Sequence, residues 1–190
     1  MALTPSIMHE LGSSAPAFAL PATDGRMVRL DDFAATPALL VAFMCNHCPY
    51  VKHIRDGFVT FAREYQARGM AVVAISSNDA SAHPDDSPEM MKVEADQYGF
   101  NFPYLHDETQ EIAKAYRAAC TPDFFLYDNR KGLAYRGQFD GSRPGNGVPV
   151  TGASLRDAAD ALLDGETVST DQFPSIGCNI KWRPGNEPAY

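Results

Sequence analysis

The fold is decided by residues 38–52, ALLVAFMCNHCPYVK. Ala38 to Phe43 are all apolar, and a short run rich in Leu, Val and Phe is typical of a strand buried on both faces of an α/β sheet. Beyond Pro49 the apolar residues recur at spacings of three and four, which places them on one face of a helix. The stretch therefore predicts a buried strand, a turn carrying two cysteines, and an amphipathic helix. The apolar helix positions are Val51, Ile54, Phe58, Phe61, Ala62 and Tyr65.

The rest of the chain alternates between strand and helix patterns. Asp24-Gly25 indicates a hairpin turn, and Ser154 is expected to cap the last helix. This order predicts a central mixed β-sheet flanked by helices on both faces. We expect further strands over residues 17–20, 27–30, 71–76, 102–105, 124–127 and 134–137, and further helices over 88–98, 109–119 and 154–163.

Size and composition predict one globular unit. The chain has 190 residues, of which 45% are hydrophobic, and this is enough for one sizeable core. No internal repeat or convincing linker divides it. We expect a single domain over residues 1–190, with a loosely held lead-in over 1–15 and an irregular tail over 165–190.

Charge and hydropathy exclude several classes of protein. The formal net charge is −8, and so acidic a surface repels nucleic acid. No apolar run approaches the roughly 20 residues that a bilayer requires, and the N-terminus lacks the pattern of a signal peptide. We therefore expect a cytoplasmic protein that binds neither nucleic acid nor membrane. In that reducing compartment, the four cysteines are not structural disulfides.

Cys45 and Cys48 lie three residues apart, where the buried strand gives way to the helix. Such a pair indicates redox chemistry, because the positive end of a helix lowers the pKa of a thiol and the thiolate is the reactive form. Pro49 suits the first helical position, which makes Cys48 the expected N-cap residue. His47 can add positive charge beside the pair.

Two other interpretations of these cysteines stay open. A buried cysteine pair can fill a core without chemistry, although the end of a strand suits that role poorly. Alternatively, zinc could be bound by Cys45, His47, Cys48 and His53, in a module without catalytic activity. The main interpretation needs no metal and no cofactor. Haem attachment is excluded because Pro49, not His, follows Cys48.

Several segments resemble the thioredoxin-fold superfamily, in particular its alkyl-hydroperoxide-reductase and thiol-specific-antioxidant branch. They are APAFAL at 15–20 with Asp24-Gly25, NHCPYVK at 46–52, CTPDFFLYD at 120–128 and GCNIKW at 177–182. The resemblance, which is to a peroxiredoxin-like subgroup, covers nearly the whole chain. It implies a thioredoxin-like fold with an N-terminal β-hairpin extension of peroxiredoxin type. It also implies a cis-proline at Pro122, with Thr121 and Pro122 binding substrate.

The resemblance also suggests which cysteine attacks. In thioredoxin-like enzymes the nucleophile usually lies about five residues beyond a strand phenylalanine, and Cys48 is five residues beyond Phe43. We therefore expect Cys48 to attack and Cys45 to resolve. The alternative has Cys45 attacking with Cys48 as its partner, which requires a shorter turn between strand and helix.

The activity implied by the resemblance depends on residue 122. Peroxiredoxins hold the peroxide with an arginine at the position where this chain has Pro122, although Arg143 could supply a guanidinium from the loop over 141–152. We therefore expect a thiol–disulfide oxidoreductase first and a thiol peroxidase, acting through a sulfenic acid, second. The expected partners are a disulfide or hydroperoxide substrate and a thiol reductant such as a thioredoxin-type protein or glutathione. A monomer and a homodimer both stay open.

Three further features complete the expectations. Cys120 precedes Thr121 and should lie near the pair, either as a third thiol or as a small buried residue. Cys178 lies in the expected tail, where many two-cysteine peroxiredoxins keep a resolving cysteine; the alternative is no function. The acidic segment with Asp79, Asp85, Asp86 and Glu89 is expected to be a solvated face.

Overall fold

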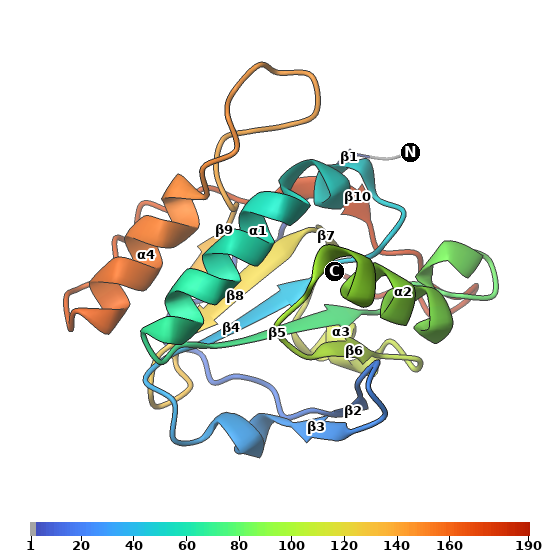
Figure 1. The fold of residues 1–190 in the computed structure, drawn as a ribbon, viewed down its shortest axis with the longest axis horizontal. Coiled ribbons are helices and arrows are strands. Elements are labelled where there is room, and N and C mark those ends of the chain that lie inside the picture. The colour runs from blue at the N-terminus through green and yellow to red at the C-terminus, as the bar shows by residue number, and fades with distance from the viewer. Residues whose placement is uncertain (1–2) are drawn as a thin grey trace.

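The computed structural model describes residues 3–190, and it has the thioredoxin-like α/β fold that the sequence predicts (Figure 1). A five-stranded mixed sheet forms its centre, in the order β6-β5-β4-β8-β9. The strand β4 runs parallel to β5 and antiparallel to β8, so the predicted buried strand lies in the middle. The strands are β4 (Leu39–Phe43), β5 (Ala71–Ser76), β6 (Tyr104–His106), β8 (Asp123–Tyr127) and β9 (Leu133–Gly137).

The side chains of β4 alternate between two cores, because successive residues of a strand point to opposite faces. Leu40 and Ala42 pack with the apolar face of α1, whereas Leu39, Val41 and Phe43 pack on the other side with the hairpin β2–β3. No helix within residues 3–190 combines the length and the apolar surface needed to cross a bilayer. The first core is covered by α1 (Pro49–Ala67), α2 (Pro88–Tyr98) and α4 (Ala153–Leu163), and the second by β2 (Ala19–Pro21), β3 (Met27–Arg29), η1 (Leu30–Phe33) and α3 (Glu111–Ala115).

A second, small sheet corrects the expectation of an irregular tail. Residues Ile176–Asn179 form the strand β10, which pairs antiparallel with β7 (Cys120–Thr121) on one edge and with β1 (Leu3–Pro5) on the other. The lead-in is therefore held by hydrogen bonds, and only residues 1 and 2 lie outside the described residues. Figure 1 shows β10 and β7 beside the N-terminal end of α1. This small sheet therefore lies next to the cysteine turn.

One helix is shorter than expected, and another is capped by a different residue. The helix expected over 109–119 is only α3 (Glu111–Ala115), since Gln110 and Arg117 on either side have positive φ angles of 66° and 51°. The cap of α4 is Gly152, with φ 71°, and not Ser154. A Cβ on residue 152 would come within 2.6 Å of the Phe139 ring, whereas the Ser154 hydroxyl accepts a bond from Gln138.

Candidate active site

The strand β4 and the helix α1 position Cys48 as the sequence predicts. Cys48 is the N-cap residue of α1, with extended backbone angles of φ −66° and ψ 123°, and Pro49 begins the helix. The first amides of a helix lack intrahelical acceptors, and they point toward this position. The Cys48 side chain is fully buried, between the helix end and the small sheet.

Three buried sulfur atoms meet at this point. The Cys48 Sγ atom lies 2.8 Å from Cys178 Sγ and 3.2 Å from the carbonyl oxygen of Thr121. The Cys45 Sγ atom is hydrogen-bonded to the hydroxyl of Thr121 at 3.4 Å, and also contacts Cys48. The structure therefore brings together Cys45, Cys48 and Thr121, which the sequence singled out, with Cys178 as a direct neighbour of Cys48.

The contacts around Cys48 favour its thiolate form. A hydrogen bond from the Cys45 thiol is the largest effect and, with one from Cys178 and the Val51 amide of the helix end, lowers the pKa of Cys48 to about 5, although burial opposes the shift. The Thr121 carbonyl is a contact that favours the protonated sulfur, since a carbonyl can only accept. The donors outweigh it, so Cys48 is an anion at neutral pH.

The other two sulfurs stay protonated. The hydrogen bond to Cys48 and then burial raise the pKa of Cys45 well above its ordinary value. Burial, followed by the hydrogen bond to Cys48, raises the pKa of Cys178 to about 12. The cluster is therefore one thiolate flanked by two thiol donors, and of the three sulfurs Cys48 is the one in the reactive thiolate form.

The strand β10 holds Cys178 against a cis peptide bond. The Thr121–Pro122 bond is cis, as the resemblance implies, and Cys178 is paired with Thr121 across the two strands. Gly177 makes this approach possible: a Cβ there would lie 2.0 Å from the Thr121 carbonyl oxygen. Beside β10, the Ser175 hydroxyl donates to the Pro122 carbonyl at 2.6 Å.

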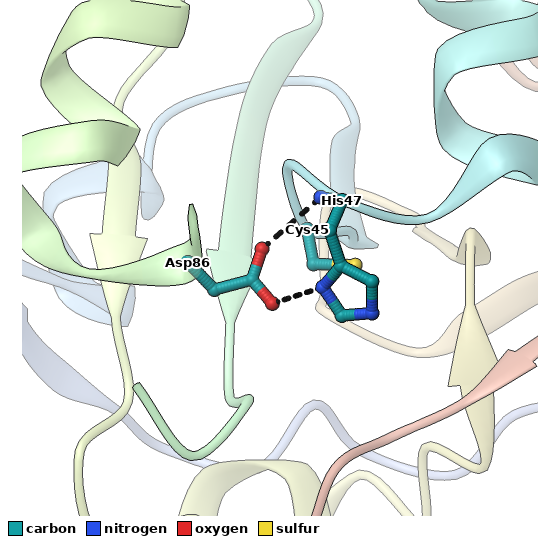
Figure 2. A group of neighbouring side chains, drawn as sticks. All are labelled: Cys45, His47 and Asp86. Carbon is teal, nitrogen blue, oxygen red and sulfur yellow. Dashed lines mark hydrogen bonds and ion pairs between the residues drawn. The ribbon is translucent and has the colours of Figure 1, made fainter. Parts of the chain in front are cut away.

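On the opposite side of the cysteine turn, His47 bonds to Asp86 (Figure 2). The His47 Nδ1 atom lies 2.5 Å from an oxygen of Asp86, whose other oxygen accepts the backbone amides of Asn46 and His47. The amide of Asn78 also donates to this carboxylate. The prediction of a solvated acidic face is therefore wrong for Asp86, which is fully buried at the end of η2 (Pro84–Asp86), and for Asp79, which is also buried.

The hydrogen bonds around Asp86 determine its charge. Burial alone would raise the pKa of Asp86, but the bonds from His47 and Asn78 outweigh it and hold the pKa below its ordinary value. The His47 ring stacks on His83, with centroids 5.0 Å apart and an angle of 10°. The bond to Asp86 is what fixes the orientation of His47, with Nδ1 directed at the carboxylate.

The residues that could hold a metal differ from those expected. Ligand atoms of Cys45, His47 and Asp86 lie within 4.8 Å of one another, but His53 is not among them. His53 lies beside Pro122 in a separate small pocket. The Asp86 oxygens already accept four N–H donors, so they are poorly available to a metal ion. The geometry fits a hydrogen-bonded Asp–His pair better than a zinc site.

Arg143 and Cys120 lie nearby but are engaged elsewhere. Arg143 belongs to the loop over 141–152, which projects from the rest of the molecule (Figure 1). Its guanidinium donates to the Asp140 and Ser142 carbonyls and to the Gln138 side chain, so it shapes the loop. Burial raises the pKa of Cys120 well above its ordinary value, and this thiol donates weakly to the Pro122 carbonyl at 3.6 Å.

Sequence reasoning missed the roles of Asp86 and Gly177. Asp86 lies 40 residues beyond Asn46, and nothing local distinguishes it from the acidic residues around it. Gly177 had a signal in the GCNIKW segment, where a residue without a side chain precedes a cysteine. Such a glycine is typical of close backbone approach, but the sequence does not say to what.

A protein-family comparison decides the family. The model of the AhpC/TSA family matches residues 11–139, which include the β2–β3 hairpin, the cysteine turn and the cis-proline segment.

The chain belongs to the AhpC/TSA family.

Solved structures and curated relatives agree with membership of the AhpC/TSA family. An uncharacterised conserved protein of Geobacillus kaustophilus is 54% identical, with a TM-score of 0.96 over 97% of this chain and 98% of that one. A hypothetical protein of Sinorhizobium meliloti is also 54% identical, with a TM-score of 0.94 over 96% of this chain and 100% of that one. A putative peroxiredoxin of Mycobacterium tuberculosis is 29% identical over 56% of this chain, and the match spans 63% of that relative's length.

Proposed function

We propose that this member of the AhpC/TSA family is a two-cysteine thiol peroxidase, in which Cys48 attacks a hydroperoxide and Cys178 resolves the product. The observation that carries the proposal is the 2.8 Å separation of the Cys48 and Cys178 sulfur atoms. A disulfide bond is about 2.05 Å long, so less than 1 Å of further approach is needed. The relatives named putative peroxiredoxins support the choice of substrate.

The proposed cycle has three steps. The Cys48 thiolate attacks the terminal oxygen of a hydroperoxide, the O–O bond breaks, and the alkoxide leaves to become an alcohol; Cys48 is now a sulfenic acid. The Cys178 thiol then attacks the Cys48 sulfur, and the hydroxyl leaves with the thiol proton as water. An external pair of thiols, on a thioredoxin-type protein or glutathione, reduces the resulting disulfide and is itself oxidised.

The position of β10 supports a small substrate. The edge of β7 at Thr121 would offer an extended partner chain its backbone groups, but β10 already occupies that edge. Cys48 is fully buried, and Gly177 leaves no space between β10 and the cis peptide. The sequence favoured disulfide exchange; the occupied edge moves our preference to a hydroperoxide.

One observation favours a second candidate, thiol–disulfide exchange with a small disulfide. Pro122 stands where peroxiredoxins place an arginine. Arg143 lines the small pocket beside Pro122, but its guanidinium already donates to Gln138, Asp140 and Ser142, which leaves it less available to a peroxide. In this candidate the same Cys48 thiolate attacks a disulfide, and either Cys178 or Cys45 resolves the mixed disulfide. The cytoplasmic location and the homodimer stay predictions.

Single Cys→Ser variants test the proposal. The reduced chain is treated with one equivalent of hydrogen peroxide, and the disulfides are mapped by mass spectrometry of the digest. We expect a Cys48–Cys178 disulfide in the unchanged chain, and neither consumption of peroxide nor disulfide in C48S. We expect a trapped sulfenic acid in C178S. C120S, which changes another buried thiol, is the matched control and should behave like the unchanged chain. A Cys45–Cys48 disulfide would make Cys45 the resolving residue.

Two activities separate the candidates. With a thiol reductant present, hydroperoxide consumption that exceeds the reduction of glutathione disulfide and insulin supports the peroxidase. The reverse order supports disulfide exchange. Alkylation by iodoacetamide checks the nucleophile: the rate at Cys48 should rise with pH through a midpoint at about 5 and be level at pH 7. A midpoint near the ordinary value of about 8.5 would contradict an activated thiolate.

A further inference from the structure

We propose that Cys45 is the proton donor to the group that leaves from Cys48's substrate, and that His47, oriented by Asp86, restores the Cys45 proton from solvent. This rests on the proposed function only in taking Cys48 as the attacking sulfur. It gives Cys45 a role other than resolution, and it gives a role to His47 and Asp86, which the proposed cycle does not use.

The need for a proton follows from the burial of the cluster. The Cys48 side chain is 0% exposed, and those of Cys45 and Cys178 are 1% and 2% exposed. An alkoxide, or the thiolate of an ordinary disulfide, leaves as a strong base and must be protonated. Bulk water has little access, so the proton must come from a neighbouring group.

The Cys45 thiol is placed to supply that proton. Its sulfur lies 3.4 Å from the hydroxyl of Thr121, and the Cys48 sulfur lies 3.2 Å from the carbonyl oxygen of the same residue, so the two sulfurs converge on Thr121. The raised pKa of Cys45 keeps it protonated while Cys48 is a thiolate. Once the leaving group departs, the Cys45 proton moves to it, and Cys45 becomes a thiolate. The Thr121 hydroxyl, 3.4 Å from the Cys45 sulfur, can donate to that transient anion.

The His47 ring connects Cys45 to solvent. Nδ1 bonds to Asp86, so Nε2 is the atom that gains and loses the exchanging proton. One nitrogen of the His47 ring lies within 4.8 Å of the Cys45 sulfur and of an Asp86 oxygen, so the ring is next to Cys45, and one water molecule can bridge a span of this length. The His47 side chain is 17% exposed, whereas the three cysteines and Asp86 are buried.

The turn does not need the hydrogen bond between Asp86 and His47 for its support. Asp86 already fixes the turn through the backbone amides of Asn46 and His47, and that anchor does not need an imidazole. The proton balance is complete: the leaving group gains one proton from Cys45, Cys45 regains one from His47, and His47 regains one from water.

The titratable groups that face the His47 ring are Asp86 and His83 from the η2 segment and Cys45 from the same turn as His47. The charge of Lys181, which follows β10, acts on His83, where it contributes to lowering the pKa.

The experiment compares leaving groups that differ in their need for a proton. The probes are tert-butyl hydroperoxide and a dialkyl disulfide, whose leaving groups need one, and an aromatic disulfide and iodoacetamide, whose leaving groups do not. The variant is His47→Gln, which removes the ring that exchanges the proton, while the backbone amides of residues 46 and 47 and the Asn78 side chain still donate to Asp86. The matched control is His83→Gln, which removes the stacked ring and leaves the Asp86 contact.

We expect His47→Gln to slow the first two reactions at least about tenfold, since a positioned proton donor contributes on the order of 10²-fold or more. The reactions with iodoacetamide and the aromatic disulfide should change less than about twofold, because Cys48 keeps its thiolate. His83→Gln should change all four little. Equal slowing of all four reactions, or no slowing of the first two, would overturn the proposal.

Two further measurements test the proposal if the first experiment fails. If the unchanged chain does not react with the hydroperoxide, the proposed peroxidase fails, and the dialkyl disulfide still tests the proton donor. If His47→Gln does not fold, the solvent isotope effect on the unchanged chain replaces it. A normal effect for tert-butyl hydroperoxide and none for iodoacetamide supports the proposal, and equal effects contradict it.

Discussion

Two buried carboxylates flank the sulfur cluster, and their environments shift the pKa in opposite directions. Asp86 accepts four N–H donors, and its pKa is held below the ordinary value. Asp123, directly after the cis-proline, forms an ion pair with Arg136 at 3.0 Å in which both side chains are fully buried. Burial raises the pKa of Asp123 to about 6, although Arg136 opposes the shift. The positive charge of Arg136 therefore lowers the pKa of Asp123 less effectively than the four N–H donors lower the pKa of Asp86.

The difference follows from the elements that carry the two residues. Asp86 ends a short 3-10 segment beside a turn, where the amides of Asn46 and His47 need an acceptor. Asp123 lies in β8, where its Oδ2 atom accepts a long hydrogen bond from the Ala119 amide, at 3.4 Å, and its Oδ1 atom has no hydrogen-bond partner among residues 3–190. The same holds for Nε and Nη1 of Arg136, whose guanidinium lies over the Phe125 ring. The Asp123–Arg136 pair is therefore structural, and its charges depend on each other.

The largest expected effect is on stability at the Asp123–Arg136 pair. Asp123→Ala should lower the free energy of unfolding by about 3 to 5 kcal/mol, because the Arg136 charge is left buried without a partner. Urea unfolding followed by circular dichroism measures it. The double variant with Arg136→Met is the control and should recover most of the loss. A loss below about 1 kcal/mol in the single variant would show that the pair is solvated. The contrast drawn here between Asp123 and Asp86 would then be wrong.

A smaller effect is expected from pH at Asp123. A carboxyl with a raised pKa holds its proton in the native state when the unfolded chain has already lost it. Stability therefore falls as pH rises from about 4 to about 6, by roughly 2 to 3 kcal/mol. The check is the difference in unfolding free energy between the unchanged chain and Asp123→Asn across this range. A constant difference would place the pKa of Asp123 near its ordinary value.

The smallest effect on stability is expected at Asp86. Asp86→Asn keeps the size but offers one acceptor oxygen in place of two, so at least one donor loses its partner. We expect a loss of about 1 to 2 kcal/mol in unfolding free energy, less than for Asp123→Ala. The same urea experiment measures it, with His83→Gln as a neighbour that should change stability little. A loss larger than that of Asp123→Ala would reverse the comparison.

Much of the fold was predictable because its signals are local. The apolar run over 38–43, the helical period after Pro49 and the pattern over 71–76 correspond to β4, α1 and β5, since each follows from which residues avoid water. The position of Cys48 at the start of α1 was predictable for the same reason. The cis Thr121–Pro122 bond followed from the resemblance and is confirmed.

By itself, the sequence determined the central sheet, the helix that begins after Cys48 and the presence of a cysteine pair where that helix starts. Only the tertiary structure decided which sulfur neighbours Cys48 across 130 residues, and that Asp86 is buried against His47. Residues close in sequence reveal their helix or strand through local spacing. The pairing of β10 with β7, or of a carboxylate with distant amides, depends instead on where the whole chain places its backbone groups.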